Sequence, residues 1–196
     1  MGSGMQARTA SSNSDPCRPI TVACLTMPRS IDLKAESPAS VEQIHSAFSD
    51  EDYWRARLAA NDTGTGTATL DSLIVDADGT VNVATTHGLF RDQLPRLVTQ
   101  LHLGHLEMVH NETWSRIGGG RVRGEASVVV PGAPLSALSA VLLTPVRNGS
   151  RLKYTATVEV KVPLVGGKIE SLIGGQLAEG IIAIQRFTTA WIAENG

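Results

Sequence analysis

The densest group of side chains that could bind a metal ion lies in a short central segment, at His102, His105, Glu107 and His110. A catalytic zinc site needs three protein ligands that converge on one point. His102 and His105 straddle a predicted helix-to-strand junction, and on the strand His105 and Glu107 share one face while His110 points to the other. This spacing does not complete a metal site, so we predict no metal and no other cofactor.

His110 and Glu112 form a second constellation, because they share a strand face with Leu106, Met108 and Trp114. If that face is interior, the pair is a polar patch in an apolar pocket, where its polar atoms need hydrogen bonds from each other or from a ligand. Such a pair could also serve as acid and base in catalysis. If the face is exterior, both are ordinary surface residues, and the sequence leaves the two readings open.

Tyr154 is a further residue that could take part in binding or catalysis. It lies on the apolar side of a strongly alternating strand, and a buried phenol needs a partner for its hydroxyl group. A ligand contact and a core hydrogen bond explain it equally well. The candidate catalytic residues are therefore His110, Glu112 and Tyr154, but the sequence contains no Gly-x-Ser-x-Gly motif and no other convincing catalytic machinery.

The triplet Gly118-Gly119-Gly120, followed by Arg121 and Arg123, could suggest a phosphate-binding loop. It lies between two predicted antiparallel strands, however, and no helix N-terminus follows it to hold an anion. We interpret it as a hairpin turn.

Composition limits the classes of protein to which the chain can belong. Its 196 residues are 42% hydrophobic and 18% charged, with a formal net charge of −2. These values fit one globular domain and give no electrostatic reason to expect a nucleic-acid partner. No apolar run reaches the roughly 18–20 residues of a membrane-spanning helix, so we expect no integral membrane association. Both cysteines, Cys17 and Cys24, precede the predicted domain, which fits a cytoplasmic protein without disulfides.

The first 29 residues show neither helical nor strand periodicity and are rich in Ser, Thr, Pro, Gly and Arg. We predict a disordered tail over residues 1–29, with an expression remnant at its start, and a folded domain over residues 30–194. Met27 is a candidate for the natural start, because patterned sequence begins only there.

Alternation of apolar and polar residues predicts a largely antiparallel sheet. Ser40 and Gln43 are spaced as a capping box and open a short helix, and a second short helix follows through Leu58. Asp78-Gly79 marks a hairpin between two strands. The predicted strands cover residues 30–36, 67–76, 80–86, 105–115, 121–130, 135–144 and 151–162, with a further helix over 92–101.

After Gly166-Gly167 the period changes from two to between three and four. Apolar residues then recur along one stripe of a helix of about 25 residues, long enough to cross a domain. The sheet must cover this stripe, because an isolated helix of this kind would not be stable. The order of elements predicts an α+β fold: a curved antiparallel sheet of about seven strands wrapped around a long C-terminal helix, with two short helices after the first strand.

Small residues concentrate where this sheet and helix should meet. Glycine inside a helix costs about 1 kcal/mol relative to alanine, so several glycines in one helix need a reason. Room for a ligand is one reason, and close approach of helix and strand is the other. The small residues are Gly124, Ala126, Ala137, Ser139 and Ala140 on the sheet, and Gly174, Gly175, Ala178, Gly180 and Ala183 on the helix.

Two segments carry a family resemblance: SPASVEQIHSAF after the first strand, and VKVPLVGGKIESLIGGQLAEG leading into the last helix. With the order of elements, they resemble the START-like (SRPBCC, helix-grip, birch-pollen-allergen-like) superfamily, and within it an actinobacterial family of uncharacterised function. The resemblance covers about Pro28 to Ala193. It implies a cavity for lipids, polyketides or other apolar small molecules, although superfamily members include carriers, cyclases and hydrolases, so the fold alone does not assign an activity.

Three functions follow from this reading. The first is a carrier or sensor of an apolar ligand, the second is a cyclase, dehydratase or hydrolase, and the third is a protein-interaction module with a filled interior and an exposed apolar groove. The sequence assigns neither the ligand nor the oligomeric state. Both faces of residues 135–144 are apolar, so the inward face of that strand stays open. We predict a ligand-binding site formed by Trp114, Leu138, Leu142, Tyr154, Ile173, Leu177 and Ile181.

Overall fold

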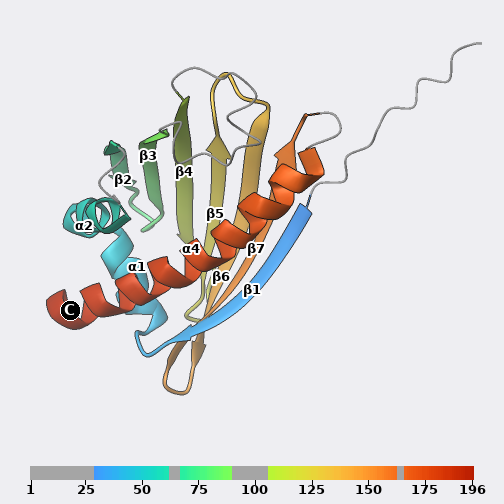
Figure 1. Ribbon diagram of the computed structural model, residues 1–196. Helices are drawn as coiled ribbons and strands as arrows, with labels where there is room; N and C mark the ends of the chain where they lie inside the picture. Colours follow the sequence, from blue (N-terminus) through green and yellow to red (C-terminus); the bar gives the residue numbers. More distant parts are fainter. Residues whose placement is uncertain (1–28, 62–66, 90–105, 163–165) are drawn as a thin grey trace, which may run out of the picture.

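A curved, seven-stranded antiparallel sheet holds a long C-terminal helix against one of its faces (Figure 1). The computed structural model describes residues 29–61, 67–89, 106–162 and 166–196. The predicted α+β helix-grip architecture is confirmed, whereas residues 1–28 of the predicted tail, the helix over 92–101, His102 and His105 fall outside the described residues. The elements are β1 (Arg29–Ser37), α1 (Val41–Phe48), α2 (Glu51–Asn61), β2 (Ala68–Val75), β3 (Val81–Leu89), β4 (Leu106–Arg116), β5 (Val122–Val129), β6 (Leu135–Val146), β7 (Gly149–Val160) and α4 (Gly166–Asn195).

The strand order is β1-β7-β6-β5-β4-β3-β2, so each strand from β2 to β7 lies beside its sequence neighbours and β1 closes the far edge. The register fixes which side chains face the helix, because side chains alternate between the two faces of a sheet. One row of directly opposed residues crosses six strands on this inner face: Leu33, Tyr154, Val141, Gly124, Trp114 and Val81.

α1 begins where the sequence predicts. The Ser40 hydroxyl accepts a hydrogen bond from the Gln43 amide at 3.1 Å, and the Gln43 side chain accepts one from the Ser40 amide at 2.9 Å. This capping box satisfies two of the amide groups that a helix leaves unpaired at its start. It orients α1 so that Ile44 and Phe48 are buried beneath the sheet.

Two separate hydrophobic clusters hold α4 at its two ends. At the N-terminal end, Ile169 packs with Val158 and Val160 of β7. At the C-terminal end, the rings of Phe187 and Trp191 lie 6.0 and 5.4 Å from the ring of Tyr53 in α2. The middle of the helix therefore spans the hollow of the curved sheet between two fixed points (Figure 1). None of the helices in the described ranges is long and apolar enough to cross a membrane.

β6 corrects one part of the predicted site. Its odd-numbered residues from Ala137 to Leu143 face inward, whereas Leu138 and Leu142 lie on the outer face, where Leu138 is 65% exposed. The prediction that these two leucines line the cavity is wrong. A strand with apolar residues on both faces carries no alternation from which to determine its orientation, and only pairing with β5 and β7 fixes it.

Two glycines provide a test of this packing. A Cβ atom added to Gly124 would lie 2.6 Å from Cε3 of Trp114, whereas one added to Gly175, on the exposed side of α4, would meet no atom within 4 Å. We expect Gly124→Ala to destabilise the fold by about 1–3 kcal/mol, because the indole must move. The control Gly175→Ala should stabilise it by up to about 1 kcal/mol through helix propensity. Urea unfolding measures both, and equal effects would contradict the described contact.

Candidate ligand-binding site

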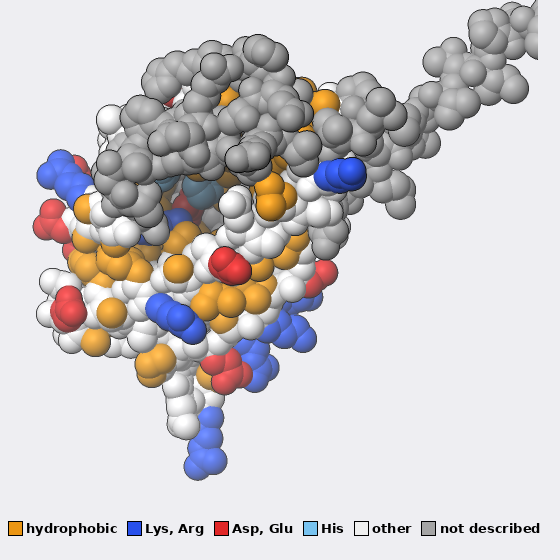
Figure 2. All heavy atoms as spheres, in the orientation of Figure 1, with side chains coloured by type: hydrophobic (Ala, Val, Ile, Leu, Met, Phe, Trp, Pro, Cys, Tyr) orange, Lys and Arg blue, Asp and Glu red, His pale blue; other side chains and the backbone are white. Residues whose placement is uncertain are grey.

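A cavity of about 350 Å³ lies between the inner face of the sheet and the middle of α4. Figure 2 shows this region from outside as a hollow beside α4, in which histidine, acidic and basic side chains are visible. Most of the wall is apolar. The residues that line it are Ile44, Phe48, Arg57, His110, Glu112, Trp114, Ala126, Val128, Ala137, Ser139, Val141, Leu143, Leu152, Tyr154, Ile173, Gln176, Leu177, Gly180, Ile181, Ile184, Gln185 and Thr188.

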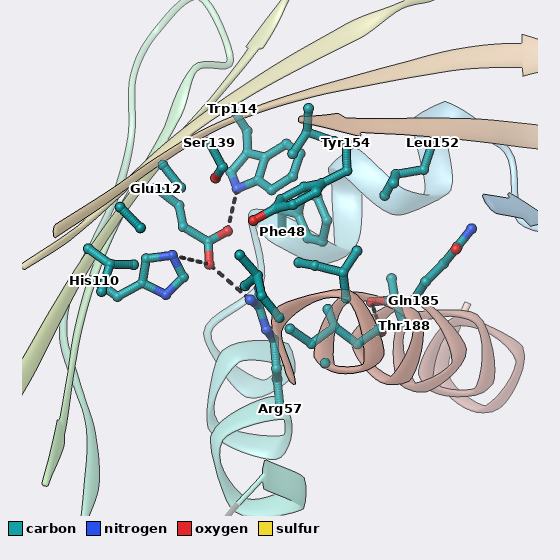
Figure 3. A pocket seen from close by; sticks show the side chains of 18 of the residues that line it. Phe48, Arg57, His110, Glu112, Trp114, Ser139, Leu152, Tyr154, Gln185 and Thr188 are labelled. Carbon is teal, nitrogen blue, oxygen red and sulfur yellow. Dashed lines mark hydrogen bonds and ion pairs between the residues drawn. The ribbon is translucent and has the colours of Figure 1, made fainter. Parts of the chain in front are cut away.

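A buried ion pair forms one end of the cavity (Figure 3). Nη2 of Arg57 donates a hydrogen bond to Oε1 of Glu112 at 2.9 Å, and the two side chains are 10% and 6% exposed. Nε1 of Trp114 donates to the other carboxylate oxygen, also at 2.9 Å. Both oxygen atoms of Glu112 are therefore hydrogen-bonded by groups of the protein itself.

Arg57 reaches the cavity from α2, where it shares one helix face with Tyr53 and Trp54. Its guanidinium carbon lies 4.6 Å above the centre of the Trp54 ring, a favourable cation–π position. Sequence reasoning missed this residue. The available signal was its spacing: Arg57 follows Tyr53 by four residues and Trp54 by three, which places it on the same side of the helix as these two aromatic residues.

The surroundings keep this ion pair charged. Burial by itself raises the pKa of the Glu112 carboxyl group, but the charge of Arg57, the electrostatic interaction with His110 when its ring is protonated, and the hydrogen bonds from Arg57 and Trp114 outweigh it, so that the pKa is lowered. For Arg57, burial acts to lower the pKa, and the attraction of Glu112 is the main influence that raises it above its ordinary value.

His110 lies beside the ion pair, with Nε2 at 3.7 Å from Oε1 of Glu112. Burial is the largest influence on the pKa of this imidazole and lowers it below 6.5, assisted by Arg57 and opposed by Glu112. The pKa of His87, from β3, is lowered in the same way by burial and by His110. Both imidazoles are therefore mainly uncharged at pH 7.

Tyr154 projects from β7 into the same space and is 3% exposed (Figure 3). Burial raises the pKa of its phenol, while a hydrogen bond with the Ser139 side chain acts in the opposite direction. The ring of Phe48 stacks at a tilt on Trp114, with 4.4 Å between the ring centres, and closes the wall nearby. The hydroxyl of Tyr154 therefore adds a neutral polar group to an aromatic and aliphatic surface.

The structure brings most of the sequence-predicted residues together. His110 and Glu112 lie on the interior face, and the cavity wall also includes Trp114, Tyr154, Ile173, Leu177 and Ile181, although their role in binding stays a prediction. Within the described part of the chain, no three His, Cys, Asp or Glu side chains are grouped so that they could hold a metal ion. The arrangement is suited to a molecule with an apolar body and a small polar group that reaches the end near His110.

Comparisons with known proteins agree with this architecture. The family model described as "Protein of unknown function (DUF2505)" matches residues 32–192. An uncharacterised protein of Mycobacterium tuberculosis is 41% identical over 175 residues, which covers 86% of this chain and 99% of the relative. These matches confirm the predicted kinship with an actinobacterial family of uncharacterised function.

Solved structures share the fold at low identity. A protein of Thermus thermophilus has a TM-score of 0.53 at 14% identity, and the match covers 86% of this chain and 100% of that one. A protein of Mycobacterium smegmatis has a TM-score of 0.51 at 11% identity, over 85% of this chain and 92% of that one.

The ion pair should be strongly coupled to folding. We expect Arg57→Met or Glu112→Leu alone to cost about 3–5 kcal/mol, because each leaves an unpaired buried charge, and the double variant to cost less than either. Arg55→Ala, which removes an exposed ion pair with Glu51 on the same helix, should cost less than about 1 kcal/mol. Denaturant unfolding of the four variants measures this coupling, and additive losses would show that the two side chains act independently.

Stability should also fall on mild acidification. The pKa values of His45, His87 and His110 are lowered from 6.5 in the folded protein, so the unfolded chain binds more protons. Their contribution is fully present above about pH 6.5 and is lost as the pH falls through that value towards the folded pKa values. We expect a lower free energy of unfolding at pH 5.5 than at pH 7.5. In the variant His110→Gln, this decrease in the free energy of unfolding should be smaller than in the unmodified protein. Identical pH slopes for the two proteins would contradict this assignment to His110, whose charged and titratable neighbours are Glu112, Arg57 and His87.

Proposed function

We propose that this chain, which belongs to the DUF2505 family of proteins of unknown function, binds an apolar small molecule between its sheet and its C-terminal helix. It would act as a carrier or sensor of that molecule. The observation that carries this proposal is the unfilled space beneath the middle of α4. Small side chains on both walls, among them Ala126, Ala137 and Gly180, support the view that the space is built into the sequence.

Gly180 distinguishes the two explanations for the helix glycines. It lines the cavity, and a Cβ atom added there would meet no atom within 4 Å, so close helix–strand approach does not account for it. A protein-interaction module with a filled interior is less consistent with this open space.

The size of the cavity favours a compact ligand. Small-molecule sites commonly measure about 300–1,000 Å³, and 350 Å³ lies near the lower end of that range. A single short chain or a small ring system fits this volume better than a two-chain lipid does. Aliphatic side chains such as Leu177 and Ile181 would contact its apolar body.

The hydrogen bonds of Glu112 favour binding over catalysis. A general acid must carry a proton that it can donate, whereas the pKa of Glu112 is lowered and both of its oxygen atoms accept hydrogen bonds from Arg57 and Trp114. A cyclase or hydrolase would therefore depend on His110 or Tyr154 without help from this carboxylate.

The cytoplasmic location and the absence of a nucleic-acid partner stay predictions.

Native mass spectrometry of the freshly purified protein tests the proposal directly. We expect a stoichiometric apolar adduct, which denaturing extraction would release for identification. In Gly180→Leu the new side chain should occupy the cavity and reduce adduct occupancy at least about tenfold, whereas Gly175→Leu, on the exposed side of α4, should leave it unchanged.

A different result would overturn the proposal. A protein that carries no adduct and binds neither decanol nor 2-naphthalenemethanol in titrations would favour the protein-interaction function. Equal loss of occupancy in the two leucine variants would show that the effect comes from the helix and not from the cavity.

A further inference from the structure

We propose that the cavity selects uncharged ligands: it accepts a compact apolar molecule with one hydroxyl or carbonyl group and rejects the matching carboxylate. This inference rests on the proposed function and deepens it by naming the chemical class of the ligand. It follows from the ion pair at the end of the cavity, in which the charges of Arg57 and Glu112 neutralise each other.

The described part of the cavity wall contains one positive and one negative side chain. Among the described residues that line it, Arg57 and Glu112 alone carry a permanent charge, and they are joined at 2.9 Å. Trp114 donates to the second oxygen atom of Glu112, and the guanidinium of Arg57 lies over the Trp54 ring. The net charge presented to a ligand is therefore zero, and neither charged group lacks a partner.

Among the described residues of the wall, a carboxylate ligand would find no free cation. To pair with Arg57, it would have to compete with Glu112, which is buried at the same place and has the same charge. Two carboxylates close together in a medium of low dielectric constant repel each other strongly. His110 gives no compensation, because burial keeps its imidazole mainly uncharged at neutral pH. A cationic ligand would also lack a free partner, because Glu112, the only carboxylate in the described part of the wall, already accepts hydrogen bonds from Arg57 and Trp114.

A neutral polar group of a ligand can form hydrogen bonds with uncharged side chains of the cavity. An uncharged imidazole offers one donor and one acceptor, and a phenol or a side-chain amide offers both functions. His110 of β4 and Tyr154 of β7 provide such groups at the cavity end near Glu112 (Figure 3), and Gln185 of α4 lines the cavity farther from the ion pair. A ligand hydroxyl or carbonyl can exchange its hydrogen bonds with water for bonds to these groups without bringing a charge into the apolar interior.

Matched probes test this selection on the unmodified protein. Isothermal titration at pH 7.5 would compare decanol with decanoate and decylamine, and 2-naphthalenemethanol with 2-naphthoate. We expect each alcohol to bind at least about tenfold more tightly than its charged counterparts, because burial of an unpaired charge is unfavourable.

A charge variant tests the cause. Glu112→Gln keeps the shape of the side chain and an oxygen acceptor but leaves the charge of Arg57 unbalanced. In this variant we expect decanoate to gain at least about tenfold in affinity relative to decanol, because Arg57 can then pair with it. The double variant Arg57→Met/Glu112→Leu removes both charges and should keep the preference for the alcohol, which provides a second test if Glu112→Gln does not fold.

The outcomes separate this inference from the proposed function. Binding of decanoate to the unmodified protein as tightly as decanol would overturn the inference and leave the ligand-binding function intact. A preference for decanol that Glu112→Gln leaves unchanged would show that the ion pair does not cause the selection, and so would also overturn it. Binding of none of the probes, by a protein that also carries no adduct, would overturn the proposed function itself.

Discussion

The fixation of α4 at its two ends is the constraint on which the rest of the structure depends. Ile169 is buried against β7 at one end, and Trp191 packs on Tyr53 of α2 at the other. A straight helix cannot follow a sheet that curves away from it between these points, so the gap must be filled by large side chains or left open. Because the facing positions carry residues as small as Ala126 and Gly180, the gap stays open as a cavity.

The buried ion pair follows from the same geometry. α2 packs against α4 through Tyr53, and one turn later this helix directs Arg57 into the end of the cavity. A lone guanidinium there would be very unfavourable, and Glu112 on the facing strand compensates it. The pair links α2 to β4 and also determines the electrostatic character of the space between them. The same pair therefore links the stability of the fold to the selection of ligands that we propose.

The sequence predicted the fold well because its signals were local. Alternation over residues 151–162, the Asp78-Gly79 turn and the capping box at Ser40 each depend on neighbouring residues only. The site depended on contacts between distant segments. Leu138 and Leu142 were assigned to the wrong face because β6 is apolar on both, and Arg57 was missed because nothing near it in the sequence indicates that Glu112 is its partner.

Gly124 of β5 and Gly180 of α4 lack a side chain for two different physical reasons. At Gly124 the indole of Trp114 occupies the place of a side chain, so the missing Cβ permits close approach. At Gly180 no atom lies within 4 Å of that place, so the missing side chain leaves space. Of the two explanations that the sequence left open for the helix glycines, the empty place beside Gly180 favours room for a ligand, whereas the contact at Gly124 joins the neighbouring strands β4 and β5 and involves no helix. Close packing of Trp114 on β5 holds the indole where it can donate to Glu112, and the missing side chain at Gly180 keeps open part of the cavity that the ion pair also lines.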